Sequence, residues 1–209
     1  MQFERHRLIY LDPARWNEIL AAYPALREMP VVVDWVAAGC PLIARRPVCE
    51  DAAGLVPLGL PLPPSLGKQR LAFAAPADAI VSDAPLPLLA DAMQSAPAAW
   101  HDTIAALVAL GPETRCFGSL AWGYLTGLPY LSETSDLDVV WKVAHADDAA
   151  RLAAALERID TEAPMRLDGE IVTPAGLAVQ WREWASDAPE VLAKAADGNR
   201  MVARIEMFA

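Results

Sequence analysis

The placement of proline is the feature that most restricts how this chain can fold. Many of its 18 prolines fall in one stretch, at Pro41, Pro57, Pro61, Pro63, Pro64, Pro76, Pro85 and Pro87. Proline lacks a backbone N–H and clashes with the preceding helical turn, so a long helix cannot cross this stretch. We therefore expect short strands and turns there.

Shorter elements precede and overlap the proline-rich stretch. Asp12-Pro13 is a typical helix start and is followed by apolar residues at helical spacing. The apolar runs at 31–33 and 41–44 are expected to form strands. Together these segments predict a small α+β N-terminal domain, residues 1–80, with its boundary at about Ile80.

Helical periodicity returns after residue 87. Residues 88–110 carry an apolar stripe that Pro97 interrupts, which predicts two helices. Further along, strands are expected at 115–117, 137–141, 165–172 and 177–181, with a brief helix from Leu120 and a longer one over 146–159. A last helix is expected over 189–196, ending at Gly198. Residues 81–209 are thus predicted to form a second domain with a mixed sheet.

Composition and charge exclude several classes of protein. The chain has 209 residues, and its apolar runs are far shorter than the roughly 18 residues of a membrane span. It begins without a signal-peptide pattern, so we expect a cytoplasmic protein with no membrane partner. A net charge of −10 argues against nucleic acid as a partner, because such binding normally needs a basic face. The three cysteines and three histidines have no zinc-site spacing.

Two short motifs carry the candidate chemistry. In Gly118-Ser119, the glycine allows close approach to a phosphate, and the serine hydroxyl with the following helical N–H groups donates to its oxygens. Asp136 and Asp138 are two residues apart in an expected strand, so both carboxylates project from one face and can hold a divalent cation, Mg²⁺. Taken singly, Gly-Ser also fits an ordinary turn, and the two acids also fit a solvated strand end.

The chain resembles the nucleotidyltransferase superfamily of polymerase-beta-like enzymes in the order of its elements. A strand is followed by Gly-Ser, a helix and a strand that carries the acid-x-acid motif. The interval from Gly118 to Asp136 is longer than is usual there, and the loop at 126–131 accounts for the difference. In the superfamily a third acid sits on a later strand, for which Asp168 fits and Glu170 is the competing choice. The resemblance implies an α+β fold in which the second domain is polymerase-beta-like.

Further segments extend the likeness over nearly the whole chain, at 59–64, 67–70, 118–122, 126–131, 135–138, 168–170 and 179–183. They resemble the holo-acyl-carrier-protein synthases, or phosphoribosyl-dephospho-CoA transferases, of malonate decarboxylase. This resemblance implies that a serine of the apo acyl-carrier subunit attacks the α-phosphate of triphosphoribosyl-dephospho-CoA and that pyrophosphate leaves. Asp136 and Asp138 would hold Mg²⁺ and Ser119 would bind phosphate, while Asp168 would complete the metal site or accept the serine proton.

Two basic clusters are candidates for binding the triphosphate. Lys68 and Arg70 follow a turn and are expected to project together, and Arg45 and Arg46 form the second cluster. A solvated basic turn explains each cluster nearly as well, because exposed cations are common. Since residues 88–184 hold few clustered cations, we expect the N-terminal domain to supply Lys68 and Arg70.

Two other functions fit the same motifs. A general nucleotidyltransferase acting on a small molecule or on another protein would use the same Gly-Ser and acid-x-acid parts. A non-catalytic adaptor could retain the fold to recognise a carrier protein, although the presence of both Asp136 and Asp138 argues against it.

Overall fold

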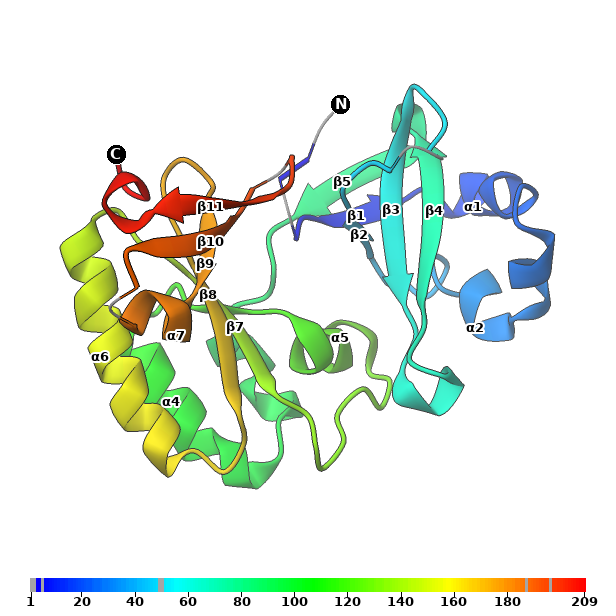
Figure 1. The fold of residues 1–209 in the computed structure, drawn as a ribbon. Helices are drawn as coiled ribbons and strands as arrows, with labels where there is room; N and C mark the ends of the chain where they lie inside the picture. The colour runs from blue at the N-terminus through cyan, green and yellow to red at the C-terminus, as the bar shows by residue number, and fades with distance from the viewer. Residues whose placement is uncertain (1–2, 5, 49–50, 187, 196) are drawn as a thin grey trace. The chain divides into compact units, whose positions relative to one another are not determined.

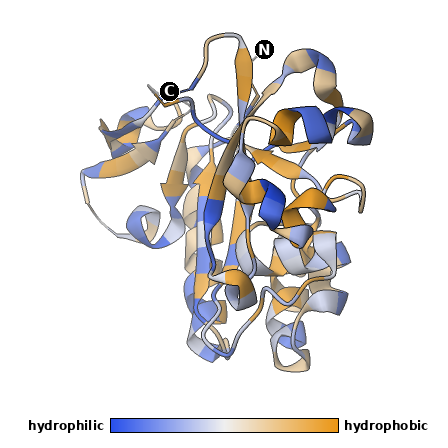
Figure 2. Ribbon diagram, turned by 90° about the vertical axis from the view of Figure 1, so that its right-hand side faces the viewer, coloured by the Kyte–Doolittle hydropathy of each residue, from blue (hydrophilic) through white to orange (hydrophobic). Residues whose placement is uncertain are grey.

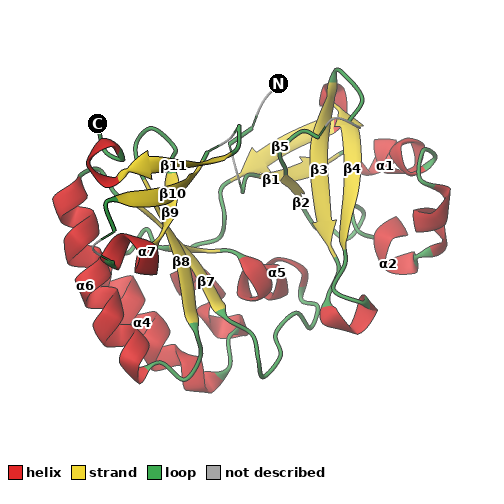
Figure 3. Ribbon diagram, in the orientation of Figure 1, coloured by secondary structure: helices red, strands yellow, loops and turns green. Residues whose placement is uncertain are grey.

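The chain divides after Leu86 into two units, each built around its own β-sheet (Figures 1 and 3). The structure is a computed structural model that describes residues 3–4, 6–48, 51–186, 188–195 and 197–209. The predicted boundary at Ile80 is too early, because β5 (Ile80–Ala84) pairs with β1 (Leu8–Leu11) and so completes the first sheet. Within the described residues, no helix has the length and apolar character needed to cross a membrane.

The first unit, residues 1–86, contains an antiparallel sheet with the strand order β4-β3-β2-β1-β5. Its remaining strands are β2 (Leu42–Ala44), β3 (Leu55–Pro61) and β4 (Arg70–Pro76). The proline-rich stretch is thus strand and turn, as predicted. Helix α1 (Pro13–Leu20) begins as expected, since the Asp12 carboxylate caps it by accepting a 2.9 Å hydrogen bond from the backbone N–H of Ala14.

The strand expected at 31–33 is wrong. These residues form a short helix, α2 (Pro30–Val33), in which the N–H of Val33 donates to the carbonyl of Met29. Pro30 occupies the first helical position, where its fixed φ favours a helix and its missing N–H costs nothing. Val32 is fully buried. Burial of the Val32 side chain in this helical turn therefore outweighs the modest preference of valine for strands.

The second unit, residues 87–209, contains a mixed sheet with the order β11-β10-β9-β8-β7-β6. Strands β7 and β8 run parallel, and the other neighbouring pairs run antiparallel. Its strands are β6 (Arg115–Cys116), β7 (Leu137–Lys142), β8 (Leu167–Val172), β9 (Ala178–Gln180), β10 (Glu190–Lys194) and β11 (Asn199–Ala203). Its helices are α3 (Leu89–Ala92), α4 (His101–Leu110), α5 (Gly118–Thr126), α6 (Ala146–Glu162) and α7 (Trp181–Ala185). Pro97 separates α3 from α4, as predicted.

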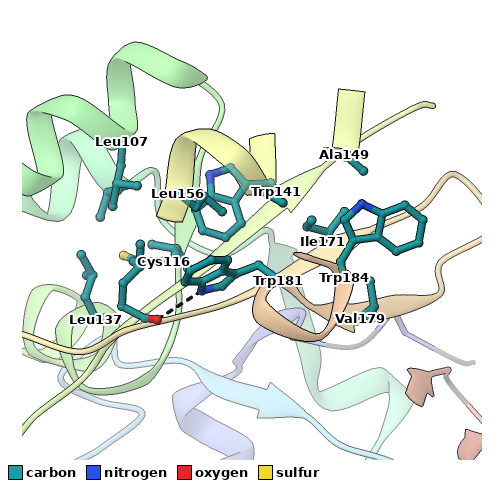
Figure 4. Packing of buried hydrophobic residues seen from close by; sticks show 14 of the residues in the cluster. Leu107, Cys116, Leu137, Trp141, Ala149, Leu156, Ile171, Val179, Trp181 and Trp184 are labelled. Carbon is teal, nitrogen blue, oxygen red and sulfur yellow. Dashed lines mark hydrogen bonds between the residues drawn. The ribbon is translucent and has the colours of Figure 1, made fainter. Parts of the chain in front are cut away.

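The hydrophobic core of the second unit lies between one face of this sheet and the helices. Leu137, Val139 and Trp141 of β7 pack there with α4 and α6. Figure 4 shows Trp141, Trp181 and Trp184 among aliphatic side chains, and its dashed line is the 3.2 Å bond from the Trp181 indole N–H to the Leu167 carbonyl. In Figure 2 both hydrophobic (orange) and hydrophilic (blue) segments are seen along the strands. Alternation along β7 therefore leaves its polar residues on the opposite face.

The helix expected at 189–196 is also wrong, because residues 190–194 form β10, which pairs antiparallel with β11, and Ala196 lies outside the described residues. Val191 and Ala193 are buried and Leu192 is partly exposed, so burial alternates with the period of a strand. The strand expected at 177–181 ends earlier, at Gln180, and Trp181 begins helix α7, which the sequence did not predict. A five-residue helix is too short to show helical periodicity.

Gly169 of β8 faces the core at a point where no side chain fits. A methyl group there would lie 2.6 Å from Cζ3 of Trp141 and 2.9 Å from the backbone oxygen of Val139. We expect Gly169→Ala to lower the free energy of unfolding by about 1–3 kcal/mol, as overpacked core substitutions do. Denaturant titration measures this, with Gly198→Ala as the control because a methyl there meets nothing within 4 Å. Equal stability of the two variants would contradict the prediction.

Candidate active site

The candidate acids lie on the face of the second sheet that points away from its core. We call it the acidic face and define it by Asp138 of β7 with Asp168 and Glu170 of β8. The parallel register pairs Asp138 with Asp168, so these two residues are neighbours across the strands, with about 4.8 Å between the strands. Asp136 lies just before β7 and is half-buried, like Asp138 and Asp168. The parallel pairing thus brings Asp168 beside Asp138.

Gly118 lies directly against the carboxylate of Asp138. A methyl group on Gly118 would be 1.8 Å from Oδ2 of Asp138, and the backbone φ of Gly118 is +63°, a conformation that glycine adopts without strain. The N–H of Phe117 donates a 3.0 Å hydrogen bond to the backbone carbonyl of Asp138, which fixes the turn on β7. The Gly-Ser motif and the acid-x-acid motif, 18 residues apart from Gly118 to Asp136, therefore form one site.

Ser119 stands in the first turn of α5, where it is half-buried. Its hydroxyl makes no hydrogen bond with the part of the chain that the structure describes. The first backbone N–H groups of a helix have no partner within the helix, and they attract anions such as phosphate. The hydroxyl and these N–H groups are therefore suited to bind an anion next to Asp138.

The two choices for a third acid have different surroundings. Glu170 is 4% exposed and accepts a 2.8 Å hydrogen bond from the Lys194 ammonium of β10, so it is part of a buried ion pair. Asp168 accepts two hydrogen bonds, both on Oδ1, from the Gly169 N–H at 2.9 Å and the Gln180 side-chain amide at 3.0 Å. Its Oδ2 accepts none from the described residues. The geometry thus favours Asp168 over Glu170.

The basic clusters of the first unit also differ from each other. The Arg45 guanidinium pairs with Asp51 and donates to backbone carbonyls, among them that of Leu58 at 3.1 Å. Arg45 therefore has a structural role within its own unit. Lys68 and Arg70 are exposed where the β3–β4 hairpin turns. Lys68 has φ +51°, outside the strand, so the two side chains do not alternate as residues of one strand would.

Cys116 of β6 is buried behind the acidic face, opposite Val139 of β7. Burial raises the pKa of its thiol to about 12, and the negative charges of Asp138 and Asp91 also raise it. The thiol is therefore neutral near pH 7, and a neutral thiol is a poor nucleophile and metal ligand.

The donor chemistry of the residues near Asp138 indicates which metal ion they could hold. Within the described residues, no group of three histidine, cysteine, aspartate or glutamate side chains is placed to hold a metal ion. Zinc centres usually need three or four protein ligands, whereas Mg²⁺ is often held by one or two carboxylates together with substrate phosphates. Asp136 and Asp138 fit the second description.

Both units match models of one protein family. Residues 88–205 match the phosphoribosyl-dephospho-CoA transferase MdcG C-terminal domain, and residues 4–85 match the N-terminal domain of the same transferase. The chain belongs to the phosphoribosyl-dephospho-CoA transferase family. The two matches meet where the structural units meet, so the transferase family shares this division into two domains.

Curated members of the transferase family align over most of the chain. A phosphoribosyl-dephospho-CoA transferase of Bradyrhizobium diazoefficiens is 41% identical over 194 residues, which is 91% of this chain and 85% of the relative. Those of Xanthomonas euvesicatoria pv. vesicatoria and Xanthomonas campestris pv. campestris are 40% and 36% identical, each covering 98% of this chain and 96% of the relative. No solved structure shows significant similarity to the chain.

Proposed function

We propose that this protein transfers phosphoribosyl-dephospho-CoA from triphosphoribosyl-dephospho-CoA to a serine of the apo acyl-carrier subunit of malonate decarboxylase. The observation that carries the proposal is the placement of Asp168 beside Asp138, with Gly118 and the start of α5 against the Asp138 carboxylate. The names of the aligned relatives support the transferred group. The carrier and the leaving pyrophosphate are part of the proposal.

In the proposed reaction, the carrier serine Oγ forms a bond to the α-phosphorus, and the bond between the α-phosphorus and the bridging oxygen of the pyrophosphate breaks. The serine proton passes to Asp168 or to solvent, and pyrophosphate leaves with the bonding electrons. Ser119 and the N–H groups at the start of α5 bind phosphate oxygens. Glu170 takes no part, because Lys194 already neutralises it.

We also propose that Asp136 and Asp138 hold Mg²⁺ together with the substrate phosphates. When bound, the ion would neutralise charge on the triphosphate and on the leaving pyrophosphate. The order strand β6, Gly-Ser, helix α5 and acid-bearing strand β7 supports the further proposal that the second unit is a polymerase-beta-like nucleotidyltransferase domain.

Intact mass spectrometry of the carrier tests the function. The protein is incubated with Mg²⁺, the apo carrier subunit and triphosphoribosyl-dephospho-CoA, and we expect the carrier mass to increase by one phosphoribosyl-dephospho-CoA group as pyrophosphate is released. A carrier variant with alanine at the acceptor serine is the control. In a parallel incubation with ATP in place of triphosphoribosyl-dephospho-CoA, attachment of a nucleotide would indicate a general nucleotidyltransferase. An unmodified carrier with no pyrophosphate released would indicate an adaptor.

We predict that the exposed cations of the β3–β4 hairpin bind the triphosphate. Loss of a charge-assisted contact costs about 1.5–3 kcal/mol, so Lys68→Ala or Arg70→Ala should weaken substrate binding roughly ten- to a hundredfold. Affinity for the apo carrier should change little. Binding titrations of each variant against both substrates measure this, with Arg27→Ala as the control because Arg27 is an exposed cation elsewhere in the same unit. Unchanged affinity for the triphosphoribosyl substrate in both hairpin variants would indicate that the hairpin is only a solvated turn.

A further inference from the structure

Gln180 connects the candidate acid Asp168 to the start of helix α7. Its side-chain amide N–H donates to Oδ1 of Asp168 at 3.0 Å. Its side-chain carbonyl accepts hydrogen bonds from the backbone N–H groups of Arg182 at 2.5 Å and Glu183 at 3.1 Å. Because an amide has one accepting and one donating end, the two N–H groups of α7 determine which end faces Asp168.

The element that holds Gln180 is itself tied to the acidic strand. The Trp181 indole and the Arg182 guanidinium both donate to the carbonyl of Leu167, at 3.2 and 3.1 Å, and Arg182 pairs with Asp160 of α6 at 2.7 Å. Leu167 is the residue before Asp168, so these bonds anchor α7 beside it. The orientation of the Gln180 amide is therefore set by a braced segment.

We infer that Gln180 is a positioning residue, which holds the Asp168 carboxylate by Oδ1 and leaves Oδ2 for the reaction. Gln180 and the Gly169 N–H supply the two hydrogen bonds that the Asp168 carboxylate accepts from the described residues, so rotation of the carboxylate is restricted. The inference rests on the role proposed above for Asp168. If Gln180 were only a helix cap, its contact with Asp168 would have no effect on catalysis.

The variant Gln180→Glu separates these two roles. Its carboxylate has nearly the shape of the amide and can still accept from the two N–H groups of α7, so the cap remains. It cannot donate to Asp168 when ionised, and two carboxylates then face each other. Gln180→Ala removes both the cap and the donor without adding repulsion. We expect thermal unfolding to show Gln180→Glu near the parent protein and Gln180→Ala below it.

The transfer assay provides the decisive measurements. Near pH 8, kcat of Gln180→Glu should fall about ten- to a hundredfold with little change in KM for either substrate, as expected when a reacting group is misplaced. Towards about pH 5.5 the pair of facing carboxylates takes up one proton, because each negative charge raises the pKa of the other, and the shared proton can then replace the amide N–H as a hydrogen bond to Oδ1. The ratio of variant to parent kcat should therefore rise as the pH falls.

Other titrating groups surround this pair and are common to variant and parent. The charged groups that neighbour it come from four elements and are Asp138, Glu170, Lys194, Arg182 and Glu183. The ratio of the two rates at each pH removes the part of the pH dependence that variant and parent share. Gln180→Ala should lose kcat without recovery at low pH. A parent kcat in Gln180→Ala would overturn the inference even if Gln180→Glu did not fold.

Asp168→Asn distinguishes failure of this inference from failure of the proposed role of Asp168. Suppose that Asp168→Asn is inactive. If Gln180→Glu then has the parent kcat at pH 8, Gln180 is only a cap and the inference is overturned. A ratio of variant to parent kcat that does not vary with pH would also overturn it. If Asp168→Asn retains full activity, the role of Asp168 fails and the inference fails with it. The inference is supported if both variants lose kcat at pH 8 and Gln180→Glu recovers activity, relative to the parent protein, at low pH.

Discussion

Asp138→Asn is expected to reduce the rate of carrier modification by about a hundredfold or more, the scale at which loss of one preorganised charge-stabilising group acts. The substitution removes one negative charge from the proposed Mg²⁺ site with almost no change in volume. Asparagine also keeps a carbonyl acceptor for hydrogen bonds, so the melting temperature without metal should not fall by more than a few degrees. Single-turnover kinetics over a range of Mg²⁺ concentrations measure the loss.

Two further variants make this test specific. Asp136→Asn should show a similar loss, because both carboxylates are proposed to hold the ion. Asp147→Asn removes a charge from an exposed position at the start of α6 and should keep the parent rate. If Asp138→Asn retained a near-normal rate at every Mg²⁺ concentration, Asp138 would not be part of the active site.

Gly118→Ala is expected to abolish transfer and to destabilise the protein. A methyl group at this position would lie 1.8 Å from Oδ2 of Asp138 and 2.6 Å from its Cγ, so either the carboxylate or the start of α5 must move. The left-handed backbone at φ +63° adds a cost of about 1–2 kcal/mol for a residue with a side chain. Displacement of a reacting group by 1 Å can reduce a rate by roughly a hundredfold.

Gly127→Ala is the matched control for Gly118→Ala. Gly127 ends the same helix with φ +70°, but a methyl group there meets nothing within 4 Å. It should therefore show the cost of the backbone conformation and keep most of the activity. Equal rates in the two variants would mean that contact between Gly118 and Asp138 does not matter for the reaction.

Local patterns were sufficient to predict much of the fold. Three features depend only on residues that are near in sequence, so a short stretch of sequence is enough to predict them. They are the Asp12 cap, the break at Pro97 and the strands that bear Asp138 and Asp168. Predictions failed for α2, β10 and α7, where elements of four or five residues are too short for periodicity to distinguish helix from strand. Packing against the rest of the unit decides such elements.

The sequence by itself determined which side chains share a face within one strand, since alternation is a property of the extended backbone. It thus identified Asp136 with Asp138, and Asp168 with Glu170, as same-face pairs. Only the tertiary structure distinguished the surroundings of Asp168 from those of Glu170, through the register of β7 with β8 and the pairing of Glu170 with Lys194. It also brought Gln180 to Asp168 and Gly118 to Asp138. Such contacts join distant parts of the chain through strand pairing, which local periodicity does not specify.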